Sequence, residues 1–253
     1  MKLLDNPQGN YRFLTGIAPY SSGVIAMPAH EIIHVVLHKP SPYLKGFKLI
    51  ARHLDSHNRP RQALCAIELR SPKPFTFEGF AGFNQSYQTI LTDWDLLVDG
   101  RNPIARTNIA PAMRPPAEPS LYAFSYTIPS PTLKRPTFVV AGAGDLVDQG
   151  ILSPDAIIRP GETSVEAMQE KAAAVMETMQ ARLFGLQVTW ADVTAVDIYT
   201  VQPIHPFLAP TILEPMEQAA VRGVHWFYSR PPITGLEFEM DMRGVRREIL
   251  VET

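Results

Sequence analysis

The order of the predicted secondary-structure elements most constrains the fold of this chain, because the same order occurs twice. Alternating and helical apolar patterns predict strand, helix, strand, helix, strand, strand in each half of the 253 residues. This internal duplication divides the chain into residues 1–130 and 131–253. We expect an α+β fold in which each half is a mixed sheet covered on one face by two helices. The opposite face of each sheet also needs burial, so the sequence predicts a homo-oligomer.

The elements behind this order follow from local patterns. In the first half they are a strand at 30–38, a helix at 42–58, a strand at 63–70, a helix at 77–91 and a closing strand pair that contains 105–111 and the segment LYAFSYTI. In the second half they are an early strand within 138–146, a helix at 163–185, a strand at 191–201, a shorter helical stretch around 206–220 and strands at 224–229 and 236–242. The helix at 163–185 has the clearest signal, because its apolar residues recur every three or four positions after a capping-box spacing of Thr163 and Glu166.

The segment HEIIHVVLH at 30–38 matches the His-Glu-x-x-His signature of helical zinc proteases, but the surrounding sequence favours a strand. A shared zinc ion needs His30 and His34 on one helix face. The interior residues Ile32, Ile33, Val35 and Val36 are all β-branched, prolines flank the segment, and the side chains alternate. On a strand, residues four apart lie roughly 13 Å apart, too far for one ion. We therefore predict no metal site here and no cofactor elsewhere.

Composition excludes several classes of function. The 23 basic and 25 acidic side chains give a formal net charge of −2, and no basic run is present, so we expect no nucleic-acid partner. No apolar run is long enough for a membrane span, and the N-terminus lacks a signal-peptide pattern. The single Cys65 excludes an internal disulfide. These features predict a cytoplasmic protein with no membrane partner.

Several short motifs, in the same order in both halves, resemble the RidA (YjgF-like) family. The segments GIAPYSSGV (16–24), FAGFNQSYQ (80–88) and ARTNIAP (105–111) resemble family motifs in the first half. In the second half, FVVAGAGDL (138–146) and RGVHWFYSRPPITGLE (222–237) resemble the early strand and the segment that runs from an arginine to a glutamate. The resemblance implies chorismate-mutase-like halves, trimers with ligand clefts between subunits, and hydrolysis of reactive enamines or imines without a cofactor.

The resemblance also implies roles for individual residues. The family arginine grips the substrate carboxylate and a glutamate activates or positions water, which places Arg222 and Glu237 as the catalytic pair. Tyr20, Asn84, Arg106 and Gly142 are the expected substrate-binding residues, and Tyr20 and Asn84 reach the catalytic pair from the other half or from a neighbouring chain. The Arg106 cleft is a second site, a substrate anchor or a structural relic. Without the resemblance, Arg222 reads as a surface charge near a helix end and Glu237 as the exposed face of an edge strand.

The expected function is that of a deaminase that releases ammonia from an enamine or imine of a small carboxylate compound. Duplicated members of this size imply 2-aminomuconate or its chlorinated form as the preferred substrate, and more than one arginine suits such a dicarboxylate. Three alternatives stay open: a 2-aminoacrylate-type imine deaminase, a chorismatase-like hydrolase, and a ligand-binding protein without catalysis. The position of Glu237 relative to Arg222 discriminates the last alternative from the enzymes.

Overall fold

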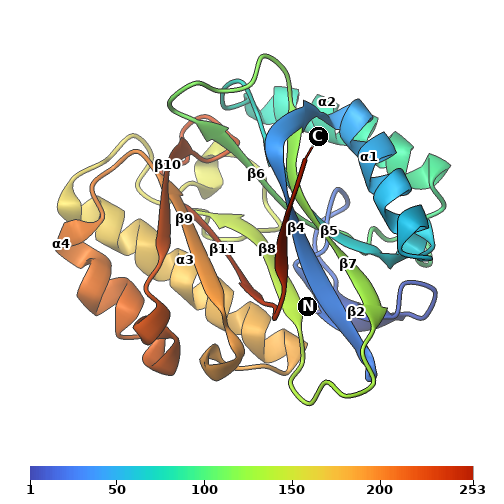
Figure 1. Ribbon diagram of the computed structural model, residues 1–253. Coiled ribbons are helices and arrows are strands. Elements are labelled where there is room, and N and C mark those ends of the chain that lie inside the picture. The colour runs from blue at the N-terminus through green and yellow to red at the C-terminus, as the bar shows by residue number, and fades with distance from the viewer. Residues whose placement is uncertain (253) are drawn as a thin grey trace.

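The computed structural model describes residues 1–252, which form one large mixed sheet with few helices (Figure 1). The strands are β1 (Leu3–Asn6), β2 (Tyr11–Leu14), β3 (Gly23–Ala26), β4 (His30–Pro42), β5 (Leu64–Arg70), β6 (Ala105–Pro111), β7 (Ser120–Pro129), β8 (Phe138–Gly144), β9 (Ala195–Thr200), β10 (His225–Arg230), β11 (Glu239–Gly244) and β12 (Glu248–Val251). The helices are α1 (Tyr43–Ser56), α2 (Phe77–Asp93), α3 (Val165–Leu186) and the single turn α4 (His205–Phe207). No helix in residues 1–252 is both long and apolar enough to cross a membrane.

The twelve strands follow the order β1-β2-β3-β8-β11-β9-β10-β6-β5-β7-β4-β12. Two runs of four strands in this order have the same connectivity. In β6-β5-β7-β4 the first pair is parallel and the others antiparallel, and β10-β9-β11-β8 repeats that pattern. The runs join through a short antiparallel contact in which Ser229 and Arg230 of β10 face Pro111 and Ala110 of β6.

Strand pairing crosses the chain midpoint at both ends. The N-terminal strand β3 pairs antiparallel with β8 of the second run, and the C-terminal strand β12 pairs parallel with β4 of the first. The division expected at residue 130 falls in the connection between β7 and β8. Each run of strands is therefore extended by a terminus that lies on the other side of that division.

Helices cover the sheet in two separate places, each with its own core (Figure 1). The helices α1 and α2 cover the first run, where Phe47, Ile50 and Leu54 of α1 are buried. The long helix α3 covers the second run with the predicted apolar stripe, of which Met168, Val175 and the other interior members are buried. The N-cap of this helix is Ser164, rather than the predicted Thr163. The Ser164 hydroxyl accepts a hydrogen bond from the Ala167 N–H.

The segment HEIIHVVLH forms the start of β4, so the strand prediction is confirmed. Its side chains alternate between environments. Glu31 accepts a hydrogen bond from Arg247, and His34 lies within 3.5 Å of Glu68. A ring nitrogen of His30 lies 3.2 Å from the Pro28 carbonyl oxygen, so the two histidines of the zinc-like signature have separate partners.

The helix predicted around residues 206–220 is wrong in its form. The chain makes the single turn α4, a π-helical turn over Leu208–Leu213 and a 3₁₀ segment over Glu217–Arg222. Prolines at 206, 210 and 215 lack the N–H groups that a continuous helix requires, which is the physical reason for the break. The strand predicted at 236–242 begins three residues later, at Glu239.

Candidate active site

A small cavity lies where the two runs of strands meet. Its volume is about 30 Å³, and strands β6, β8 and β11, helix α2 and three loops line it. Its polar lining includes Tyr20, Arg106, Asn108, Gln149 and Glu239. Most of the remaining lining is apolar, from Phe80, Leu146, Leu152, Pro232, Ile233 and Leu236. A few converging polar groups in an apolar enclosure are typical of a small-molecule site.

Arg106 of β6 is held in a fixed orientation with part of its guanidinium free. One terminal nitrogen donates a hydrogen bond to Asn84 Oδ1 at 2.6 Å, and the guanidinium lies 4.9 Å from the Tyr20 ring centre. Its other terminal nitrogen, Nη1, is buried without a partner. The Asn108 amide nitrogen is also buried without a partner, while its oxygen accepts from Ser71. Two unpaired donors on one strand, both lining one cavity, are suited to bind a carboxylate.

Glu239 is the carboxyl group of this cavity. It is the first residue of β11 and is 4% exposed. Burial raises its pKa well above the usual value, and the nearby Asp241 raises it further, against opposing effects of Arg182 and Arg106. Within residues 1–252, no hydrogen bond or ion pair engages its carboxyl oxygens. A carboxyl group with a raised pKa and no partner, next to two free donors, can give a proton to a bound ligand and take it back.

Gly142 of β8 makes room for this carboxyl group. A β-carbon at position 142 would lie 2.3 Å from Glu239 Oε1, well inside van der Waals contact. The same β-carbon would also lie close to Thr107, so it could not move away from the carboxyl group in that direction. Glycine is therefore required at position 142, because the Glu239 carboxyl group comes close to the backbone there.

We expect Gly142→Ala to reduce turnover by roughly 10- to 100-fold while the protein stays folded, because the added methyl group displaces the Glu239 carboxyl by the order of an ångström. Steady-state kinetics on purified protein measures this change. Gly82→Ala is the matched control, since a β-carbon there meets no atom within 4 Å, and it should leave turnover unchanged. Equal activity of both variants would remove the close approach from the argument.

Arg182 of α3 reaches the same region from behind β8. It is 2% exposed and donates hydrogen bonds to the carbonyl oxygens of Ala141 and Gly142, at 2.7 and 3.2 Å. Burial lowers its pKa to about 10, and Tyr20 and Glu239 oppose that shift. The guanidinium thus fixes the backbone against which Glu239 rests and adds positive charge near the cavity.

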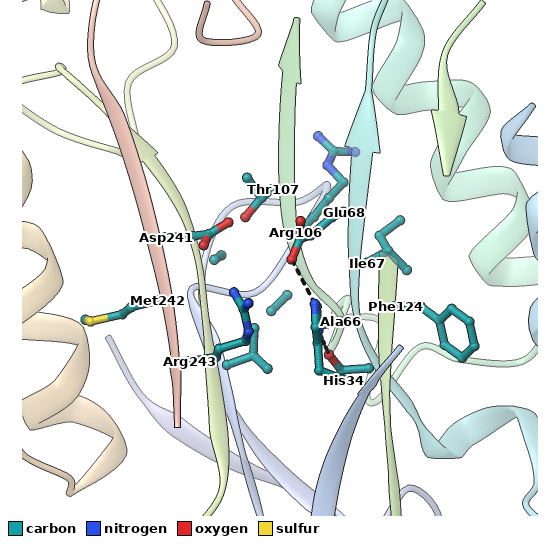
Figure 2. A pocket seen from close by; sticks show the side chains of 14 residues that line it. His34, Ala66, Ile67, Glu68, Arg106, Thr107, Phe124, Asp241, Met242 and Arg243 are labelled. Atoms are coloured by element: carbon teal, nitrogen blue, oxygen red, sulfur yellow. Dashed lines mark hydrogen bonds and ion pairs between the residues drawn. The ribbon is translucent and has the colours of Figure 1, made fainter. Parts of the chain in front are cut away.

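A second group of buried charges lies next to this cavity (Figure 2). Carboxylate oxygens of Glu68, Asp197 and Asp241 lie within 4.8 Å of one another. Figure 2 shows Asp241 and Thr107 pointing toward each other, whereas Met242 and Phe124 point away. Each carboxyl group has partners: Arg70 contacts Glu68 at 3.2 Å, Arg243 contacts Asp197 at 2.7 Å, and the Tyr199 hydroxyl donates to Asp241 at 3.1 Å. This internal charge balance fits an ion-pair network that joins the two runs of strands better than a metal site.

Comparison with known proteins identifies the family of the chain. The family model of 2-aminomuconate deaminase CnbZ matches residues 3–249. The chain belongs to this family. A curated relative, the 2-amino-5-chloromuconate deaminase of Comamonas testosteroni, is 40% identical over 244 residues, which is 96% of each chain.

Two solved structures have lower similarity to this CnbZ-family chain. A putative endoribonuclease from Thermotoga maritima has a TM-score of 0.32 at 18% identity, with 44% of this chain and 80% of that chain covered. A chorismatase has a TM-score of 0.48 at 11% identity, with 88% of this chain and 77% of that chain covered.

The structure brings four of the six residues singled out in the sequence together. Tyr20, Arg106 and Gly142 line the cavity of the CnbZ-family chain, and Asn84 holds the arginine. The sequence did not single out Glu239, Asn108 or Arg182. Glu239 had a signal in the alternating segment LEFEMDM, whereas a buried arginine on a helix gives no local signal.

Arg222 and Glu237 are not brought together. Arg222 is exposed at the end of the 3₁₀ segment and lines a different cavity. Glu237 precedes β11, is half-buried, and accepts a hydrogen bond from Gln202 at 3.1 Å. The predicted Arg222–Glu237 pair is therefore not a unit in this fold, and the carboxyl group beside Arg106 is Glu239.

A buried ion pair holds the segment that leads into β11. Lys171 of α3 contacts Asp145 at 2.7 Å, and neither side chain is exposed. The other Asp145 oxygen accepts from the backbone N–H groups of Glu237 and Phe238, at 3.0 and 3.2 Å. The ion pair thus fixes the backbone immediately before Glu239.

We expect Lys171→Met to lower the free energy of unfolding by about 3–5 kcal/mol, because it leaves the Asp145 carboxylate buried without its cation. Urea unfolding followed by circular dichroism measures the loss. The double variant Lys171→Met/Asp145→Asn should recover part of it, and Arg159→Met, at an exposed ion pair, should change stability little. A Lys171→Met protein as stable as the wild type would contradict the anchoring role.

Proposed function

We propose that this protein hydrolyses 2-aminomuconate or its chloro-substituted form to the corresponding keto or hydroxy acid and ammonia, without a cofactor. The observation that carries the proposal is the pair of unpartnered donors on Arg106 and Asn108, in one cavity with the buried carboxyl group of Glu239, whose pKa is raised. Membership of the CnbZ family and the 40% identity to a 2-amino-5-chloromuconate deaminase support the choice of substrate.

In the proposed reaction, Arg106 and Asn108 bind the carboxylate next to the amino-bearing carbon. Glu239 gives its proton to a carbon of the conjugated enamine, which becomes an iminium ion. The resulting carboxylate takes a proton from water as the water oxygen bonds to the iminium carbon. Glu239 then protonates the nitrogen of this carbinolamine, the C–N bond breaks, and the hydroxyl proton returns to the carboxylate as ammonia leaves.

Substrate entry requires movement around the cavity. A six-carbon dicarboxylic acid is larger than this cavity, whose volume is about 30 Å³. Two of the loops that line this space contain Leu146 and Leu152, and Pro232 and Leu236. We propose that these loops separate when substrate binds and exclude water again before the proton transfers.

We also propose that residues 1–130 and 131–253 are two RidA-like halves, that the protein is cytoplasmic, and that it assembles as a homotrimer. The shared connectivity of the two four-strand runs supports the halves. The cavity takes β6 from one half and β8 and β11 from the other, which makes it a single site within one chain. One site per chain explains why the two halves have different residues at corresponding positions.

Ammonia release from 2-aminomuconate and from 2-aminoacrylate, each generated in situ, tests the function. We expect turnover of 2-aminomuconate above the spontaneous rate and a much lower kcat/KM for 2-aminoacrylate, which has one carboxylate. Faster turnover of 2-aminoacrylate would instead assign a general imine deaminase. Tight binding of 2-aminomuconate without ammonia release would assign a binding protein.

The raised pKa of Glu239 predicts the pH dependence of the reaction. Burial and Asp241 keep the carboxyl group protonated above its usual range, and the first step needs the protonated form. The value of kcat/KM should therefore stay level through mildly acidic pH and fall as pH rises through that pKa. Rates corrected for spontaneous decay between pH 5.5 and 10 give the profile. An activity that rises with pH over this range would mean that Glu239 acts first as a base.

A further inference from the structure

The cavity that contains Arg222 is separate from the one that contains Glu239. Its volume is about 510 Å³. It lies among the β7–β8 connection, the segment before β9, the 3₁₀ segment that ends at Arg222, and the end of β11. This volume falls in the range typical of ligand-binding pockets. None of its lining residues lines the Glu239 cavity.

Four cationic side chains line this second cavity: Lys134, Arg135, Arg222 and Arg246. Within residues 1–252, none of them forms an ion pair or a side-chain hydrogen bond. The only acidic side chain in the lining is Asp192, whose carboxylate already accepts hydrogen bonds from the backbone N–H and the hydroxyl of Thr189. The cavity therefore gathers unneutralised positive charge on a chain whose formal net charge is −2.

The four cations come from three segments far apart in the sequence. Lys134 and Arg135 belong to the connection between β7 and β8, Arg222 ends the 3₁₀ segment, and Arg246 lies in the turn between β11 and β12. Gly244 is buried at the cavity wall and packs closely, because a β-carbon there would clash with the Phe138 ring and with the Asp192 carbonyl oxygen. Like charges repel, so their convergence on one concave space is favourable when an anion binds between them.

We propose that this cavity, the cationic cavity, binds a small multivalent anion that carries carboxylate or phosphate groups. Guanidinium groups pair with both kinds of oxyanion through two parallel hydrogen bonds. A cavity of this volume suits a small molecule. The sequence has no basic run of the kind that binding to a nucleic-acid backbone would require. Arg222 thereby has a role in binding that is independent of the deaminase reaction.

Isothermal titration calorimetry with pyrophosphate and, separately, with adipate tests this proposal. The double variant Arg222→Ala/Arg246→Ala removes two cations from the cavity, and Lys45→Ala/Lys48→Ala removes two exposed cations from α1 as a matched control. We expect the wild type and the control to bind at least one probe, with at least about 10-fold weaker binding in the cavity variant. Affinity should also fall as salt is raised, because the cations are exposed. Preference for pyrophosphate would assign a phosphate-bearing ligand, and preference for adipate a dicarboxylate.

Three results would overturn the proposal. The first is that the wild type fails to bind either probe. The second is that the control variant loses as much affinity as the cavity variant, which would show general charge attraction. The third is a change of oligomeric state in the cavity variant, measured by light scattering, which would assign the cationic cavity to contact with a second copy. Adipate binding that persists in the cavity variant while pyrophosphate binding weakens belongs to the Glu239 cavity, and it assigns a phosphate-bearing ligand to the cationic cavity.

Discussion

Glu239→Gln should abolish most of the deaminase activity while leaving the fold intact. The amide has the same size as the carboxyl group but cannot give a proton to the enamine or accept one from water. We expect kcat for ammonia release to fall by about 100- to 10,000-fold, the usual contribution of a general acid–base group. KM should change little, because Arg106 and Asn108 keep their donors. Steady-state ammonia release from 2-aminomuconate measures both constants.

Glu237→Gln is the matched control, since Glu237 lies two residues earlier and pairs with Gln202 outside the cavity. It should keep near-normal activity. The stability of Glu239→Gln at pH 8 provides a second check. In the wild type, the folded state holds a proton on Glu239 that the unfolded chain releases above its ordinary pKa of 4.5, so this group favours unfolding increasingly as pH rises. The amide removes that dependence, and the variant should be at least as stable as the wild type. A large loss in Glu237→Gln with none in Glu239→Gln would return the catalytic role to Glu237.

Local periodicity predicted the regular elements of the fold well. The helices at α1, α2 and α3 and the strands β4, β5 and β6 lie within a few residues of the predicted ranges, because each has a continuous apolar pattern. The strands β1 to β3 and β12 were missed. Each is four residues long, too short for a clear pattern, and the partner of β12 and one of the two partners of β3 lie more than a hundred residues away. Tertiary pairing determines such strands, and no local signal reports it.

The site was predicted in part, because the family resemblance identified residues but could not fix the register at β11. Glu237 and Glu239 have the same parity in LEFEMDM, so alternation places both on one face and cannot choose between them. The choice depends on where the strand begins, and the hydrogen bonds of Asp145 to the N–H groups of residues 237 and 238 place that start at Glu239. Lys171 and Arg182 were missed for a related reason, since charged residues on a helix are expected at its exposed face.

Arg106→Lys should weaken substrate binding strongly although it keeps the positive charge. Lysine lacks the planar pair of donors, so it cannot hold Asn84 and a carboxylate oxygen in the same fixed geometry. We expect kcat/KM for 2-aminomuconate to fall by about 100- to 1,000-fold, which corresponds to the loss of one or two charge-assisted hydrogen bonds of about 1.5–3 kcal/mol each. Most of the loss should be in KM, because the carboxylate is held in both the ground state and the transition state.

Arg70→Lys is the matched control for this substitution. Arg70 is another buried arginine, on β5, but it contacts Glu68 and the Tyr122 ring and does not line the Glu239 cavity. Both lysine variants introduce a similar change into the interior, so a shared loss of stability should appear in both. Only Arg106→Lys should raise KM. If both leave KM unchanged, the carboxylate anchor is elsewhere, and the unpartnered Nε of Arg182 is the next group to test. The two outcomes therefore separate a substrate-binding arginine from one that serves only the ion-pair network between the strands.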